Sequence, residues 1–144
     1  MQHNNENTNA FLIHISSFAG YIFPFGSIIT PLIIWQTLKD KSPYLDEHGK
    51  EAVNFNISFG LYIFILGASF FSFFFGSILD IFHGINVDFD LGNHHSRNGL
   101  FGFLGIASLV SIVSLIKIAL IILAAMKANN GEVYKYPFTI KFIK

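Results

Sequence analysis

Long runs without charge constrain this chain more than any other feature of its sequence. No Asp, Glu, Lys or Arg lies in residues 10–38 or 53–79, and residues 98–126 contain only Lys117. Each run exceeds the roughly 20 residues that a helix rising 1.5 Å per residue needs to cross a ~30 Å hydrocarbon layer. A soluble bundle would carry charge along the outer faces of its helices, and these runs carry almost none. We therefore predict an all-α, polytopic helical membrane protein.

Composition excludes several other classes of protein. The nine basic residues balance the nine acidic ones, so no basic surface favours nucleic acid. Cysteine is absent, which excludes disulfides, cysteine-ligated zinc and cysteine nucleophiles. Residues 1–9 are polar and have neither a basic region nor a small-residue cleavage site. We therefore expect the first apolar run to be retained rather than removed as a signal peptide.

The first run, residues 10–38, is interrupted by Gly20, Pro24, Gly26 and Pro31, which disfavour a continuous helix. We expect two helical pieces, residues 10–23 and 27–38, joined at residues 24–26. At 29 residues the run is long for one span and short for two. It either crosses once as a kinked span or forms a re-entrant hairpin.

The rest of the chain predicts two long helices. Ser42 and Pro43 are typical of an N-cap followed by proline at the first helical position. Asn129, Asn130 and Gly131 are typical of a helix end. We predict a single membrane domain, residues 1–144, with three or four membrane segments. Its parts are a broken helical segment at 10–38, long helices at 43–81 and 99–128, and a tail at 132–144.

Basic residues in the connectors predict the orientation. Lysines gather in residues 39–50 and near the C-terminus, whereas the connector at 82–98 has only Arg97. By the positive-inside rule, residues 39–50 and the C-terminus face the cytoplasm of a multi-pass cell (inner) membrane protein, and residues 82–98 face outward. The N-terminus lies outside if the first run crosses once and inside if it forms a hairpin.

The tail alternates apolar and polar residues, which predicts a strand-like or extended segment. Its lysines favour contact with an anionic leaflet. Alternatively, the tail pairs as an edge strand with the first connector.

Polar residues within the apolar helices are the candidate functional positions. Glu51, Asn54, Ser58 and Ser72 share one side of the second helix at 100° per residue. This side packs against neighbouring helices or lines a hydrophilic path. Lys117 either acts as an intramembrane charge or extends to the headgroups. If buried, its antiparallel neighbours are near Asn54 and Ser58, with Glu51 as a possible counter-charge.

Catalytic patterns are not recognisable in this sequence, and we predict a protein that is not an enzyme and has no cofactor. The histidines have no metal-ligand spacing on a common face, and the serines have no activating His and carboxylate pattern. A cluster in the 82–98 connector could hold a metal, but solvated loop residues are commoner. It consists of Asp88, Asp90, His94 and His95.

Four phrases of the sequence resemble a known family. They are GYIFPFG at 20–26, PLIIW at 31–35, DEHGKEAVNF at 46–55 and NGEVYKYP at 130–137. Together they are similar to small prokaryotic membrane proteins of the Tic-twenty-like family, a domain of unknown function grouped with the chloroplast inner-envelope import component. The resemblance covers residues 11–144. It implies a helical membrane fold and a role in or beside a protein-conducting complex, and it supplies no catalytic residues. Its motif positions are Pro24, Gly26, Pro31, Trp35, Asp46, His48, Asn54, Gly131 and Pro137.

Three functional hypotheses follow. The first is a non-enzymatic subunit or accessory factor of a membrane assembly for protein translocation or insertion. The second is a homo-oligomeric channel or small-solute transporter lined near Glu51, Asn54, Ser58 and Lys117. The third is immunity against an envelope-targeting toxin. The expected partners are the lipid bilayer and other membrane proteins or further copies of this chain, and not nucleic acid.

Overall fold

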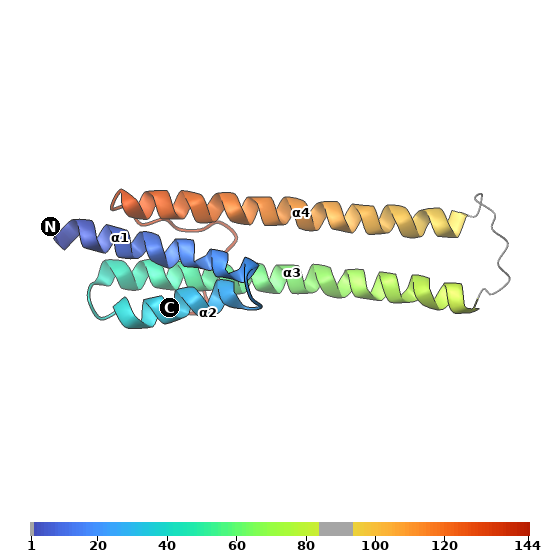
Figure 1. The fold of residues 1–144 in the computed structure, drawn as a ribbon, viewed down its shortest axis with the longest axis horizontal. Helices are drawn as coiled ribbons and strands as arrows, with labels where there is room; N and C mark the ends of the chain where they lie inside the picture. The colour runs from blue at the N-terminus through green and yellow to red at the C-terminus, as the bar shows by residue number, and fades with distance from the viewer. Residues whose placement is uncertain (1, 84–93) are drawn as a thin grey trace. The chain divides into compact units, whose positions relative to one another are not determined.

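The structure is a computed structural model that describes the backbone of residues 2–83 and 94–144. It describes the side chains of residues 5–71, 74, 75 and 104–144. In the described residues, four α-helices and one 3₁₀ helix follow one another (Figure 1), namely α1 at Gln2–Ile15, η1 at Ser16–Tyr21, α2 at Gly26–Leu38, α3 at Pro43–His83 and α4 at His94–Asn129. No strand occurs in the described residues, so the all-helical prediction is confirmed.

Two of these helices are long and apolar enough to cross a membrane. The candidate spans are Pro43–Phe71 in α3 and Leu104–Asn129 in α4, and α2 is a shorter apolar helix. With 41 and 36 residues, α3 and α4 measure roughly 60 Å and 54 Å at 1.5 Å per residue. Both exceed a ~30 Å hydrocarbon layer. These helices are consistent with a small helical membrane protein.

The chain divides into two compact units. Unit 1 comprises Met1–Gly60 and Ile116–Lys144, and unit 2 comprises Leu61–Leu115. Large apolar side chains of unit 2 are exposed, among them Phe64, Phe71 and Leu115. Serines of α4 in this unit donate to carbonyls of their own helix, as Ser111 does to Ala107. The hydrogen bonds between α3 and the C-terminal tail lie in unit 1.

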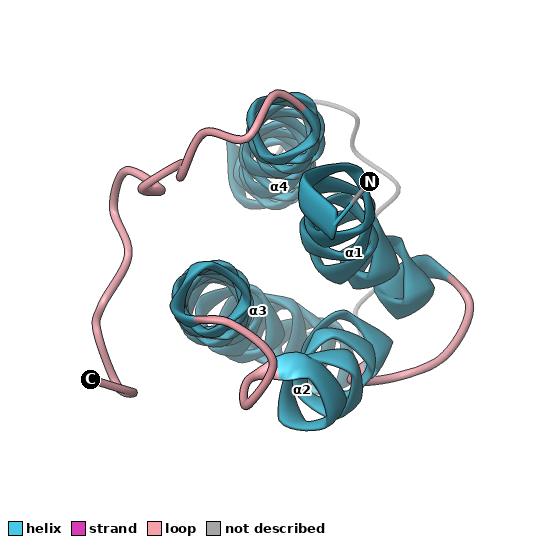
Figure 2. Ribbon diagram, turned by 90° about the vertical axis from the view of Figure 1, so that its left-hand side faces the viewer, coloured by secondary structure: helices cyan, strands magenta, loops and turns pink. Residues whose placement is uncertain are grey.

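Unit 1 has a core of small residues from three helices. Ala10 of α1, Ala52 of α3 and Ala128 of α4 are fully buried, together with Ile13 and Leu45. Figure 2 views the four helices α1, α2, α3 and α4 end-on, with the tail beside α3. Alanine lets helix backbones approach closely, which is the usual device of helices packed in lipid.

The first helix differs from the prediction. It begins at Gln2 rather than near residue 10 and ends at Ile15, after which η1 continues to Tyr21. A polar residue in the N-terminal part of this helix contacts the end of α4. Asn7 Nδ2 donates to the carbonyl of Asn129 at 3.2 Å.

The chain turns where the sequence predicts a break. Phe25 has a left-handed conformation with φ of 61°, and α2 begins at Gly26. A Cβ atom on Gly26 would overlap the carbonyl of Ala19, so glycine lets the two segments approach. Because α2 contacts both η1 and α1, the first run doubles back within unit 1.

The start of α3 is fixed by its cap and by Trp35. Ser42 Oγ accepts the backbone N–H of Leu45 at 3.3 Å, which confirms the predicted N-cap. Trp35 Nε1 donates to Asp46 Oδ1 at 2.9 Å. The Trp35 ring occupies the space that a Cβ on Gly49 would need. These contacts attach α2 to the first turns of α3.

The end of α4 confirms the predicted helix stop. Gly131 has φ of +81°, its N–H donates to Ala128 O at 3.0 Å, and Glu132 N–H donates to Lys127 O at 2.9 Å. This pair of bonds is the Schellman arrangement of helix ends. The tail that follows contains neither strand nor helix.

The connector before α4 differs in part from the prediction. We expected an irregular segment at 82–98, but α4 already begins at His94. Residues 84–93 lie outside the described residues, and so does the candidate metal position at Asp88 and Asp90. The side chains of His94 and His95 are likewise not among those described.

Candidate functional site

A polar strip on α3 is the candidate functional site. It consists of Glu51, Asn54 and Ser58, whose spacing of three and four residues places them on one side of the helix. Asn54 and Ser58 are buried at 2% and 0% exposure, and Glu51 at 6%. We call these three residues the α3 strip. The C-terminal tail covers them.

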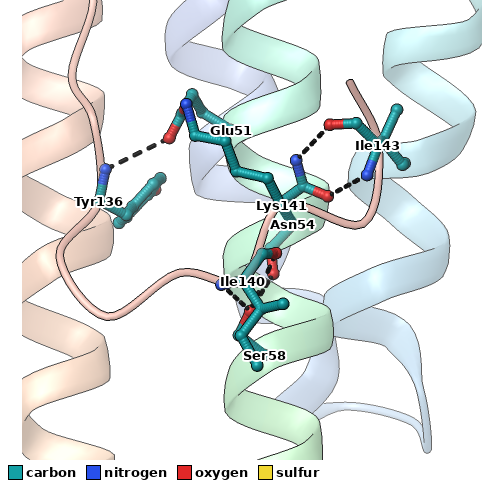
Figure 3. A network of polar contacts seen from close by, with 7 residues as sticks. All are labelled: Glu51, Asn54, Ser58, Tyr136, Ile140, Lys141 and Ile143. Atoms are coloured by element: carbon teal, nitrogen blue, oxygen red, sulfur yellow. Dashed lines mark hydrogen bonds and ion pairs between the residues drawn. The ribbon is translucent and has the colours of Figure 1, made fainter.

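Asn54 and Ser58 bind the backbone of the tail (Figure 3). Asn54 Nδ2 donates to the carbonyl of Ile143 at 2.9 Å, and the N–H of Ile143 donates to Asn54 Oδ1 at 2.8 Å. The N–H of Ile140 donates to Ser58 Oγ at 2.8 Å, and Ser58 Oγ also donates to Asn54 O within α3 at 2.7 Å. The side chains of α3 thus replace the partners that a strand or helix would give these backbone groups.

Glu51 forms the third contact of the strip with the tail. Its Oε2 accepts the backbone N–H of Tyr136 at 3.4 Å, and its Oε1 lies 3.7 Å from Lys141 Nζ. The side chain of Lys141 is 63% exposed, so this ion pair is partly solvated and individually weak. We predicted Glu51 as a counter-charge for Lys117, but among the described ion pairs Glu51 pairs with Lys141.

The tail follows a bent path along α3. Tyr136 contacts Glu51, Ile140 contacts Ser58 seven residues further along the helix, and Ile143 returns to Asn54. Seven helical residues correspond to about 10 Å at 1.5 Å per residue. Phe138 lies in this bend with φ of 58°, a left-handed conformation that is unusual for a bulky residue. The predicted edge strand with the first connector is therefore wrong, because side chains of α3 take the backbone hydrogen bonds.

A buried cluster of two histidines and a tyrosine attaches the tail to α1 and α3. Tyr136 Oη lies 2.9 Å from His14 Nδ1, and His14 Nε2 lies 2.8 Å from His48 Nδ1. The Tyr136 ring stacks on Phe55 with centroids 3.9 Å apart and an interplanar angle of 13°. Tyr44 lies edge-on to His48 and donates to the carbonyl of Ala128 at 2.9 Å. The cluster thus joins α1, α3, α4 and the tail.

The burial of the cluster keeps His14 neutral. Desolvation, and then repulsion from a charged His48, lowers the pKa of His14 from 6.5 to about 3. Desolvation also raises the pKa of Tyr136 well above 10, and the charges of Tyr134 and Glu51 add to this effect. Tyr136 is therefore a neutral phenol at pH 7. His48 Nε2, at one end of the cluster, is buried without a hydrogen-bond partner among the described atoms.

The side chains of this site hold the C-terminal tail against α3. Both ring nitrogens of His14 are engaged, one by Tyr136 and one by His48. In the described part of the chain, no group of three or more His, Asp or Glu residues is spaced to hold a metal ion. Apart from the Glu51–Lys141 ion pair, the groups that hold the tail are hydrogen-bonding partners in a buried setting. Such groups make one position of the tail more favourable than others.

The remaining candidate positions lie apart from this site or outside the description. Lys117 is a half-buried residue of α4, and Ser72 belongs to α3 with a side chain outside the described set. We predicted that the α3 strip lines a path or packs against helices, but it contacts the tail. The spacing of its residues in the sequence did not indicate this partner.

The motif positions divide into structural roles. Gly26, Trp35, Asp46 and Gly131 form the turns and contacts described above. His48 and Asn54 belong to the cluster and the strip. Pro31 is buried within α2, whereas Pro24 and Pro137 are exposed.

Sequence reasoning missed the meeting of His14, His48 and Tyr136. His14 is 34 positions from His48 and 122 positions from Tyr136 in the sequence, so no local pattern connects them. The usable signal was a histidine within an otherwise apolar stretch at His14. A polar residue there needs a buried partner.

The fold and site define a class: a small all-helical protein with two membrane-competent helices and a C-terminal tail held by buried polar side chains. The chain belongs to the magnetosome magnetite crystal formation protein family (MamF/MmsF), whose family model matches residues 5–143. No curated protein and no solved structure matches the chain significantly. The predicted membership of the Tic-twenty-like family is wrong, because this match covers nearly the whole chain.

Proposed function

We propose that this protein is a non-enzymatic subunit of the magnetosome membrane that takes part in magnetite crystal formation. The observation that carries the proposal is the family match over residues 5–143. The apolar lengths of α3 and α4 support a place within a membrane. Nothing in the family description supports protein translocation, and we do not retain that role.

The arrangement of unit 1 supports one topology. Residues 39–50, the C-terminal lysines and α1 all belong to unit 1. We propose that this unit lies toward the cytoplasmic side and that α3 and α4 cross the membrane from it. In this topology both termini are on the same side, and the first apolar run folds back without crossing.

The partners follow from the exposed apolar surface. On the part of α4 in unit 1, Ile116, Ile122, Leu123 and Met126 are between 43% and 58% exposed. Such a surface needs lipid, another membrane protein or a second copy of the chain. We propose that the protein works within an assembly in this way. A channel is not proposed, because the strip that would have lined it contacts the tail.

Complementation tests the proposal. The chain is expressed with a small tag in a magnetosome-forming bacterium that lacks its own member of the family. We expect the protein to copurify with magnetosome membranes and crystal size in electron micrographs to return toward that of the parent. An Asn54→Ala, Ser58→Ala variant is the matched comparison for the tail site. Unchanged crystals, with the protein present in the magnetosome membrane, would contradict the proposed role.

A further inference from the structure

The tail carries large apolar side chains on its outer surface. Phe138 is 80% exposed, Phe142 is 51% exposed and Ile140 is 43% exposed. All three lie in the bend that runs from Tyr136 to the end of the chain. In water, three such side chains on one short irregular segment would be an unfavourable surface.

Several backbone groups of the same bend are bound by side chains of α3 rather than left to water. Ile140 N–H bonds to Ser58, and both the N–H and the C=O of Ile143 bond to Asn54. Irregular backbone is tolerated at membrane depth only where its polar groups are covered in this way. Asn54 and Ser58 themselves belong to the uncharged run of α3 that starts after Glu51.

The charges of the tail fit the boundary of a membrane. Beyond Glu132 the tail contains Lys135, Lys141 and Lys144 and no acidic residue. Lysines extend to anionic headgroups while neighbouring apolar and aromatic groups enter the acyl layer.

We propose that the C-terminal tail is a membrane-inserted strap, whose partner is the lipid bilayer. The bend at Phe138–Phe142 enters the acyl layer beside α3, Asn54 and Ser58 hold its backbone at Ile140 and Ile143, and its lysines contact anionic headgroups. The inference rests on the proposed placement of α3 and α4 in a membrane. It adds a third membrane contact that is neither a spanning helix nor a separate anchor.

Spin-label accessibility tests the strap in the full chain. Because the sequence contains no cysteine, each introduced cysteine is a unique site for a nitroxide. The test positions are Phe138→Cys and Phe142→Cys. The controls are Leu123→Cys on the exposed surface of α4 and Asp40→Cys in the connector after α2. The protein is reconstituted in vesicles of phosphatidylcholine with phosphatidylglycerol, and accessibility to oxygen and to a water-soluble nickel chelate is measured.

The expected result is that labels at 138 and 142 favour oxygen as the label at 123 does, while the label at 40 favours nickel. Nickel access at 138 and 142 with oxygen access at 123 would overturn the strap and leave the membrane placement intact. Nickel access at 123 as well would overturn the membrane placement itself. Low access to both reagents at 138, with broadening from a second label, would assign the surface to another copy and overturn the lipid partner.

A second variant checks the role of the strip. In the background of the 138 label, Asn54→Ala and Ser58→Ala together leave the Ile140 and Ile143 backbone groups without their partners. We expect the label to lose its oxygen preference and gain nickel access, while the helical circular dichroism stays unchanged. A label that stays in the acyl layer would overturn the proposed role of Asn54 and Ser58.

Discussion

Replacing Asn54 with alanine should release the tail from α3. The amide of Asn54 makes two hydrogen bonds with Ile143, at 2.9 Å and 2.8 Å, and only 2% of the residue is exposed. Each such bond contributes about 0.5–1.5 kcal/mol net, so their loss weakens tail docking by about 2 kcal/mol. This corresponds to a roughly thirtyfold increase in the ratio of undocked to docked tail, since 1.4 kcal/mol is a factor of ten.

Hydrogen exchange followed by mass spectrometry measures this ratio. The C-terminal peptide reports the amides of Ile140 and Ile143, whose partners are on α3. In Asn54→Ala these amides should exchange about thirtyfold faster if exchange occurs from the undocked tail. Peptides from α1 and α2 should exchange as in the parent protein.

Asn56→Ala is the matched control on the same helix. Asn56 is fully buried and donates to Ser17 Oγ at 2.7 Å and to Ala52 O at 2.9 Å, and neither acceptor belongs to the tail. It should weaken the contact with η1 without selectively freeing the tail. The reasoning is refuted if Asn54→Ala leaves tail exchange unchanged, or if Asn56→Ala accelerates it equally.

Three further predictions concern unit 1. Because burial lowers the pKa of His14 from 6.5 to about 3, stability should be full above about pH 6.5 and fall at lower pH by up to about 1.4 kcal/mol per pH unit. Unfolding midpoints in detergent should show this slope, and His14→Gln should reduce it; an equal slope in the variant would exclude His14 as its source. Gly49→Ala should cost about 1–3 kcal/mol, because its Cβ would overlap the Trp35 ring. Gly60→Ala, whose nearest atom would be 3.7 Å away, should be neutral or stabilising by up to about 1 kcal/mol, and equal midpoints for the two alanine variants would contradict the packing argument. Gly131→Ala should cost about 1–2 kcal/mol, because alanine disfavours φ of +81°, and an unchanged midpoint would show that the end of α4 relaxes freely.

Interactions between neighbouring residues were sufficient to predict the long helices and their ends. Uncharged runs longer than a bilayer predict apolar helices, and α3 and α4 are such helices. Ser42 with Pro43 predicts a helix start, and Gly131 predicts a helix end, because each effect depends on residues within one turn. The first run was harder, since its helix starts at Gln2, before the apolar run begins, and contacts the distant residue Asn129 through Asn7.

Assigning the family required more than the four short sequence motifs. Motif positions such as Gly26, Trp35, Asp46 and Gly131 are explained by turns and contacts that position helices. Such positions report a shared way of packing, and they do not by themselves report a role. The match over residues 5–143 replaced the first assignment because it covers nearly the whole chain.

The sequence by itself determined that this chain is helical, apolar and interrupted near residue 24, because helix length, charge and turn chemistry are properties of neighbouring residues. Only the tertiary structure decided what the polar residues do. Glu51, Asn54 and Ser58 share a side of α3 in any helix, but their partners lie 82 to 89 residues away in the tail. His14 meets Tyr136 across 122 residues. Hydrogen bonds act over about 3 Å in space, and the folded chain alone brings such distant groups to that distance.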